Sequence, residues 1–72
     1  MLKWQVNHDG TEYMLLEQGE SGTKQILAEA YLDPADGIWY WSATRDDGDR
    51  LEDVAAATPG RCLHAVETFL WS

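Results

Sequence analysis

The stretch at residues 33–53, DPADGIWYWSATRDDGDRLED, holds an aromatic run between two groups of acidic residues. Residues 38–43 of this stretch predict a β-strand, because aromatic and β-branched side chains suit a pleated, half-buried surface. Alternation along the strand places Trp39, Trp41 and Ala43 on one face and Ile38, Tyr40 and Ser42 on the other, and we expect one of these two faces to be core. The stretch therefore predicts a rigid platform whose two acidic turns lie on the surface.

Two strands and a tight turn are predicted at the start of the chain. Residues 2–6 alternate apolar and polar side chains, which is the period-2 pattern of a half-buried strand. Residues 12–17 carry large apolar side chains on both faces, which predicts a central strand or one covered on both sides. The Asp9-Gly10 dipeptide between them is typical of a hairpin turn, because glycine adopts positive φ at no steric cost. A second turn is predicted at residues 19–22.

A third strand is predicted over residues 24–32, where apolar side chains again alternate in part. Strict alternation places Ile26 on the same face as Ala28 and Ala30. It places Leu27 on the opposite face. The two small alanines leave room for a bulky element to lie against their face, and a helix is the usual occupant in an α+β layer.

A C-terminal helix is predicted from Thr58 onward. Threonine is a good N-cap, and Pro59 fits the first helical position, where its missing N–H is not needed. For residues 50–57 the sequence leaves two readings open, a short helical turn capped by Asp49 or an irregular segment. The apolar stripe of the C-terminal helix follows i, i+3/i+4 spacing and contains Cys62, Leu63, Val66, Phe69 and Leu70.

These elements predict a single α+β domain over residues 1–72 with the order ββββα. Connections of about 3 to 6 residues favour neighbouring hairpins, so we expect a four-stranded antiparallel meander with the helix packed on one face. At this length one core supplies only about 3 to 5 kcal/mol of net stability. The fold must therefore bury nearly every large apolar side chain that it has.

Charge and composition favour some partners and compartments over others. Thirteen Asp and Glu against five Lys and Arg give a net charge of −8, which disfavours direct binding to nucleic acid or to anionic membranes. The natural partner of such a chain is a basic protein surface. One cysteine permits no internal disulfide, and we find neither a signal peptide nor a membrane-spanning run. We therefore expect a cytoplasmic protein.

No residue pattern in the chain supports catalysis. His8 and His64 are far apart in sequence, and Cys62 and His64 at i and i+2 do not face each other on a helix. The acidic runs lack the spacing of an EF-hand, although a weak, nonspecific divalent-ion site in them stays open. Base stacking on the aromatic strand would need accompanying basic residues. We expect no enzymatic activity, no cofactor and no specific metal site.

The acidic residues around the aromatic strand are the candidate partner-binding surface. Lys and Arg that are placed to bind phosphates also bind carboxylates, so rigid carboxylates can occupy a DNA-binding surface. The two groups flank six strand residues and lie about 20 Å apart at about 3.3 Å per residue, so a compact site is expected to use the group after Ala43. A solvated loop that only keeps the protein soluble explains the same residues. The candidates are Asp33, Asp36, Asp46, Asp47, Asp49, Glu52 and Asp53.

The chain resembles the small, acidic, phage-encoded anti-CRISPR proteins of the DNA-mimic kind that act against type I systems, including type I-C. The resemblance covers the whole chain in size, charge and layout, with GIWYW at residues 37–41 and AVE at residues 65–67 resembling small phage and bacterial β-sheet-plus-helix proteins. It implies an inhibitor that occupies a basic DNA-binding surface of a Cas effector, a Cascade subunit, in the bacterial host cell. We expect a monomer. The alternative is an antitoxin-like or regulatory domain that dimerises through exposed sheet aromatics.

Overall fold

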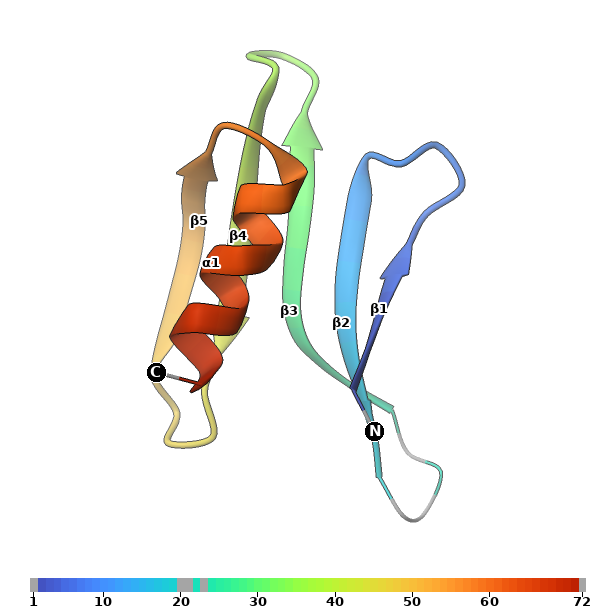
Figure 1. Cartoon of the computed structure of the whole chain (residues 1–72), viewed down its shortest axis with the longest axis vertical. Coiled ribbons are helices and arrows are strands. Elements are labelled where there is room, and N and C mark those ends of the chain that lie inside the picture. The colour runs from blue at the N-terminus through green and yellow to red at the C-terminus, as the bar shows by residue number, and fades with distance from the viewer. Residues whose placement is uncertain (1, 20–21, 23, 72) are drawn as a thin grey trace.

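The computed structural model describes residues 2–19, 22 and 24–71. They form one antiparallel sheet in the order β1-β2-β3-β4-β5, followed by a helix (Figure 1). The α+β class, the meander and the C-terminal helix are confirmed, but the sheet has five strands and not four. The elements are β1 (Leu2–Val6), β2 (Glu12–Gln18), β3 (Lys24–Asp33), β4 (Ile38–Thr44), β5 (Arg50–Ala56) and α1 (Pro59–Trp71).

The additional strand, β5, occupies the segment for which the sequence left a short helical turn open, and that helical reading is wrong. The ladder pairs Trp41 with Val54 and Ala43 with Leu51, so β5 has one more residue than β4 between these pairs. Asp53 lies in this bulge with a left-handed φ of 52°. The bulge interrupts the period-2 pattern, and the edge position lets the charged side chains face water.

A second bulge, between β2 and β3, changes which side chains reach the core. Leu15 pairs with Ala28, whereas Leu16 pairs with Ile26, so Leu27 is an extra residue in β3. Leu27 packs against the core, and Ile26 is 51% exposed. Strict alternation therefore assigned Leu27 and Ile26 to the wrong faces. The pattern holds on the C-terminal side of the bulge, where Ala28 is buried as expected.

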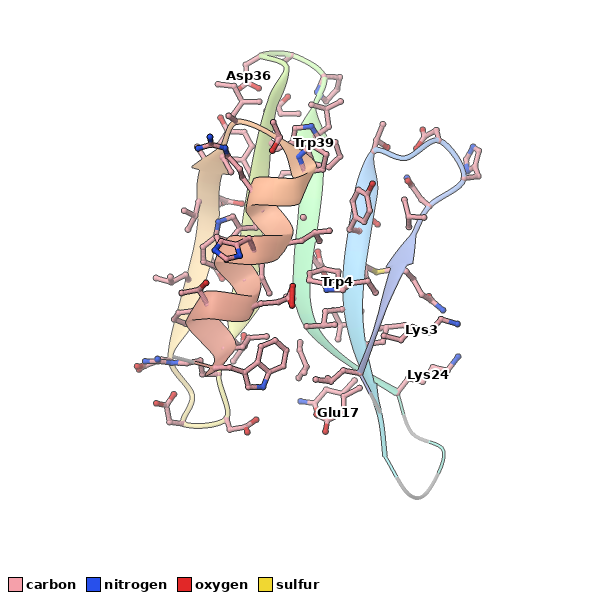
Figure 2. The ribbon with its side chains drawn as sticks, in the orientation of Figure 1. Lys3, Trp4, Glu17, Lys24, Asp36 and Trp39 are labelled. Carbon is pink, nitrogen blue, oxygen red and sulfur yellow. The ribbon has the colours of Figure 1, made fainter. Side chains whose placement is uncertain are left out.

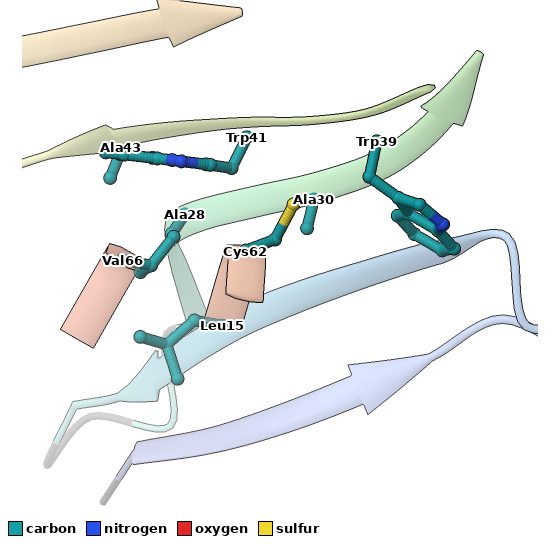
Figure 3. Packing of buried hydrophobic residues seen from close by; sticks show 8 residues of the cluster. All are labelled: Leu15, Ala28, Ala30, Trp39, Trp41, Ala43, Cys62 and Val66. Atoms are coloured by element: carbon teal, nitrogen blue, oxygen red, sulfur yellow. The ribbon is translucent and has the colours of Figure 1, made fainter. Parts of the chain in front are cut away.

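The core lies between α1 and one face of the sheet (Figure 3). Ala28 and Ala30 of β3 are buried next to Cys62 and Val66 of α1, which confirms that small side chains make room for the helix. Trp41 packs its ring against the helix as well, 6.0 Å from the ring of Phe69. Among the described residues, the buried core consists of Leu15, Ala28, Ala30, Trp39, Trp41, Ala43, Cys62 and Val66.

The start of α1 is capped as the sequence predicts. The backbone N–H of Arg61 donates to Thr58 Oγ1 at 3.1 Å, and that of Cys62 donates to the Thr58 carbonyl at 3.1 Å. Pro59 is the first helical residue. From there α1 lies over β3, β4 and β5 and leaves β1 and β2 to one side (Figure 1). No helix in the described part of the chain is long and apolar enough to cross a membrane.

The first predicted turn is present between β1 and β2. Gly10 has a φ of 76°, and its N–H donates to the carbonyl of Asn7 at 3.2 Å. Asp9 Oδ1 accepts a hydrogen bond from the Thr11 hydroxyl at 2.6 Å, which lowers the pKa of Asp9. The turn predicted at residues 19–22 includes residues 20 and 21, which lie outside the described residues.

Candidate functional site

The sheet face opposite α1, here called the open face, carries two tyrosines on adjacent strands. Tyr31 of β3 and Tyr40 of β4 are direct cross-strand partners. Their ring centroids lie 5.9 Å apart with planes at 27°, a stacked arrangement. Both alternate with core residues along their strands, so both point away from α1. The pair forms a rigid aromatic surface on the open face, close to the turn between β3 and β4.

A carboxylate accepts a hydrogen bond from each of these tyrosines. The hydroxyl of Tyr31 donates to Asp53 Oδ1, and that of Tyr40 donates to Asp36 Oδ2 at 2.8 Å. The hydrogen bond to Asp53 raises the pKa of Tyr31 to about 12, and the bond to Asp36 raises the pKa of Tyr40. Both phenols therefore stay neutral donors at physiological pH and keep the two carboxylates in place.

The bulge in β5 positions Asp53. Its left-handed backbone carries the aspartate side chain toward β3, and its N–H donates to Ser42 Oγ of β4 at 3.1 Å. Aspartate tolerates this conformation better than most residues because its short side chain bonds locally. The acidic residue that the sequence places in a charged loop is thus part of the sheet.

The turn between β3 and β4 positions the other carboxylates of the open face. Asp33 Oδ1 accepts a hydrogen bond from the Ala35 N–H, and Asp36 Oδ1 accepts one from the Ile38 N–H, each at 2.9 Å. Such local bonds are typical of aspartate in turns. The negative charge of Asp33 also contributes to the raised pKa values of the two tyrosines, which places it near the same pair.

The turn between β4 and β5 has a different electrostatic character. Arg45 Nη2 lies 2.7 Å from Asp49 Oδ2, and its Nε lies 3.8 Å from Asp47 Oδ1. The hydrogen bond with Asp49 raises the pKa of Arg45. The guanidinium also lies 4.7 Å from the centre of the Phe69 ring, which ties the turn to α1. Asp46 in the same turn is exposed. Arg45 therefore offsets part of the negative charge here.

Glu52 is paired in a similar way. Its Oε1 accepts a hydrogen bond from Arg50 Nε at 2.6 Å, and Arg50 Nη1 donates to Thr44 Oγ1 at 2.6 Å. Both charged groups are exposed, so the pair contributes little to stability, about 0 to 1 kcal/mol. It reduces the net negative charge at this end of β5.

The structure divides the seven candidate residues differently from the sequence. Asp33, Asp36 and Asp53 gather around the tyrosine pair, because β5 runs back antiparallel along β4. The residues of the Arg45 turn lie at the other end of β4, where Asp47 and Asp49 pair with Arg45. Sequence reasoning missed the tyrosine pair. In the sequence, Tyr31 and Tyr40 each alternate with apolar residues of a predicted strand, and this was the signal for their common face. The strand register that makes them cross-strand partners was not visible in the sequence. The Arg45 turn holds Asp46, Asp47 and Asp49, and the ion pair beside it holds Glu52.

Other chemistry-bearing residues lie apart from the open face. Within residues 2–19, 22 and 24–71, no group of three or more histidine, cysteine, aspartate or glutamate side chains is placed to hold a metal ion. Cys62 is buried in the core, and burial raises the pKa of its thiol. His64 is exposed on α1, and His8 is exposed in the first turn.

No protein-family model, curated protein or solved structure matches the chain. The fold and the site define a small acidic α+β domain with an uncovered sheet face, on which carboxylates surround a stacked tyrosine pair. A proposal about function therefore depends on the chemistry of that face.

Proposed function

We propose that the protein is a non-enzymatic inhibitor that binds a basic, phosphate-binding surface of another protein through its open face. The observation that carries this proposal is the placement of Asp33, Asp36 and Asp53 around the stacked pair Tyr31 and Tyr40. Backbone ladders and hydrogen bonds hold these groups before any partner arrives. Preorganised groups lose little conformational entropy on binding, which favours affinity.

The chemistry of this face fits arginine and lysine. A guanidinium binds a carboxylate bidentately as it binds a phosphate, and it also stacks on tyrosine rings. Arg50 of β5 is already bonded to Glu52 and Thr44. The net charge of −8 would also speed encounter with a basic surface at low ionic strength.

The resemblance to acidic anti-CRISPR proteins suggests the target. On this proposal the partner is a DNA-binding surface of a Cas effector, a Cascade subunit, and the bound inhibitor excludes target DNA. The carboxylates would take the positions of backbone phosphates, so no chemistry on the protein is required. Counterions would be released from both partners, and binding should weaken steeply with salt.

Two charge-matched variants test the proposal in a competition assay, in which the protein displaces labelled target DNA from purified type I Cascade. Asp36→Asn with Asp53→Asn removes two charges from the open face, and asparagine also tolerates the left-handed backbone at position 53. Asp46→Asn with Asp47→Asn removes two charges from the Arg45 turn. We expect the first variant to need about tenfold more protein for half displacement, and the second less than about threefold more.

Two outcomes would overturn the proposal. Equal losses in the two variants would show that total charge acts and not the arrangement on the open face. Absence of displacement by the wild-type protein at low salt would exclude this target. Circular dichroism of both variants provides the control for folding.

The alternative function, a regulatory domain that dimerises through sheet aromatics, is not favoured by the charges of this face. Two open faces brought together would place Asp36 and Asp53 of one copy against acidic residues of the other. Like charges in contact across an interface cost several kcal/mol, more than the roughly 0.5 to 1.5 kcal/mol that an aromatic pair contributes beyond its buried area. A salt-insensitive dimer in sedimentation equilibrium would reverse this preference.

A further inference from the structure

The sheet face that carries α1 is only partly covered. Over β1 and β2 it presents four side chains, Leu2, Trp4, Val6 and Tyr13, here called the N-terminal strip. Leu2 is 43% exposed and Val6 is 54% exposed, although both lie on the core side of the sheet. Figure 2 shows Trp4 on this part of the sheet, to one side of α1. The strip is an apolar surface beside the helix.

The side of α1 next to the strip carries the apolar Leu63 and Leu70, with the acidic Glu67 between them. Leu70 and Leu2 line a common cavity of about 100 Å³, together with the acidic Glu17. Leu63 lies two turns before Leu70 on the same side of the helix. Trp71, which also lines the cavity, is 55% exposed. The helix side and the strip thus border the same cavity, which lies at one end of both.

Dimensions show that the layer has room for one more element. Five strands span about 24 Å, and a helix with its side chains is about 10 Å wide, so α1 covers about half of the face. The chain exposes 4919 Å², whereas a folded monomer of 8.1 kDa exposes about 4,500 Å². The difference, about 400 Å², belongs to the whole molecule, and the exposed Leu2 and Val6 contribute to it.

The acidic residues around the N-terminal strip indicate what kind of partner it would bind. The rim of the strip carries Glu17 and Asp46, which line the cavity, and Glu67, which lies on the same side of α1 as Leu63 and Leu70. Lys3 alternates to the open face. We propose that the N-terminal strip binds an amphipathic helix of a partner protein, with apolar side chains against the strip and lysine or arginine toward the rim.

The strip sets the length of this partner segment. Five strand residues at about 3.3 Å each give a strip about 17 Å long, which corresponds to about 11 helical residues, or three turns. Anchors at i, i+4 and i+7 would reach Leu2, Trp4 and Val6. The inference is independent of the proposed function, because the strip and the open face lie on opposite sides of the sheet.

A second copy of the chain fits the strip less well. Two strands offer an area about 17 Å by 10 Å, well below the roughly 800 Å² per partner of a stable interface. Two chains of charge −8 also repel each other. Helix α1 is already packed on its own sheet, and the face that it turns away from the sheet carries Arg61, His64 and Thr68 and so offers no apolar stripe to a neighbour.

A designed peptide provides the test. The probe is a fluorescein-labelled 14-residue helix with leucine at i, i+4, i+7 and i+11 and lysine on both flanks, compared with a scrambled peptide of the same composition. Fluorescence anisotropy should show saturable binding of the patterned peptide, at least about fivefold tighter than the scrambled one. Val6→Lys should weaken that binding about tenfold. Ile26→Lys, the same charge change at a residue 51% exposed on the open face, should weaken it less than threefold.

Each contrary result has a definite meaning. Equal binding of the scrambled peptide, or equal losses in the two variants, would show attraction by net charge alone and overturn the inference. A dimer in sedimentation velocity that Val6→Lys abolishes would show that a second copy occupies the strip, and this too would overturn it. If Val6→Lys loses the circular dichroism spectrum of the wild type, Trp71→Lys replaces it, because Trp71 is a helix-end residue at the same surface.

Discussion

Asp53 and Tyr31 are 22 residues apart in sequence, yet a hydrogen bond joins them on the open face. The carboxylate raises the pKa of Tyr31 to about 12, because it accepts a hydrogen bond from the neutral phenol and repels the tyrosinate. Asp53→Asn should bring the pKa of Tyr31 back toward its ordinary value of about 10. Absorbance at 295 nm against pH measures the shift, with Tyr31→Phe as the assignment control. An unchanged titration curve would contradict the contact.

The raised pKa of Tyr31 also makes the free energy of unfolding depend on pH in the alkaline range. The folded pKa of Tyr31, about 12, lies above the ordinary value of about 10, so its contribution is fully present below pH 10. That contribution should be lost as the pH rises from about 10 to about 12. Urea unfolding at both ends of this window should show a fall in the free energy of unfolding, and Asp53→Asn should show a smaller fall. Equal falls would assign the effect to other groups.

Cys62 is the second residue whose environment predicts a measurement. Its side chain is fully buried between α1 and β3, and burial raises the pKa of the thiol. A buried, protonated thiol reacts only when the helix opens, so the reaction with Ellman's reagent should be about a hundredfold slower in buffer than in urea. Reaction at the unfolded rate in buffer would show that α1 is detached from the sheet.

At the scale of elements, the packing of α1 on the sheet supplies most of the core. Val66 is fully buried, and Val66→Ala should cost about 2 kcal/mol through lost contacts and a residual cavity. That is about half of the stability expected for a domain of this size. His64→Ala on the exposed side of the same helix should change stability by less than about 0.5 kcal/mol. Urea unfolding of the two variants checks the contrast, and similar losses would contradict the packing.

Elements whose signals are local were predictable from the sequence. The cap at Thr58 and Pro59 and the turn at Gly10 each depend on residues next to one another in the chain. The alanine pair of β3 also indicated a helix above it, because small side chains have one obvious use in a layered fold. These features specify where the helix starts and which sheet face it covers.

The two bulges were not predictable in the same way. Each adds one residue to a strand and shifts the alternation beyond it, as Ile26 and Leu27 show in β3. In β5 the bulge puts two charged residues between Leu51 and Val54, which pair with Ala43 and Trp41, so the alternation of a strand is lost and the segment resembled a loop. The candidate site depends on the bulge in β5, because this bulge brings Asp53 to Tyr31. The sequence therefore named the candidate residues but grouped Asp53 with the Arg45 turn and not with Asp33 and Asp36.

At the scale of the whole molecule, the two faces of the sheet differ in chemistry. The open face carries tyrosines and carboxylates, while the N-terminal strip on the other face is apolar with an acidic rim. Both surfaces belong to one small domain whose described part has a radius of gyration of 12.2 Å, against about 11 Å expected for 72 residues. The sheet is wider than its single helix, which leaves the N-terminal strip beside α1, whereas the open face lies on the side of the sheet opposite α1.

The net charge of −8 also predicts how the whole fold responds to salt. Repulsion among the carboxylates destabilises the compact state, and salt screens it over a Debye length of about 10 Å at 0.1 M. The ion pairs of Arg45 and Arg50 are screened as well, but surface ion pairs contribute little to stability. Relief of repulsion should therefore dominate. We expect Tm to rise by about 4 °C between about 10 mM and 200 mM NaCl, equivalent to about 1 kcal/mol.

A charge variant separates the two contributions. Asp46→Asn with Asp47→Asn removes two carboxylates, so the net charge changes from −8 to −6. The Arg45–Asp49 pair stays in place. Its Tm at low salt should exceed that of the wild type, and its rise with salt should be smaller, because less repulsion remains to be screened. Scanning calorimetry at the two salt concentrations gives both numbers. A wild-type Tm that falls with salt would mean that the ion pairs of Arg45 and Arg50 outweigh the repulsion, and that the acidic surface is better neutralised than its net charge indicates.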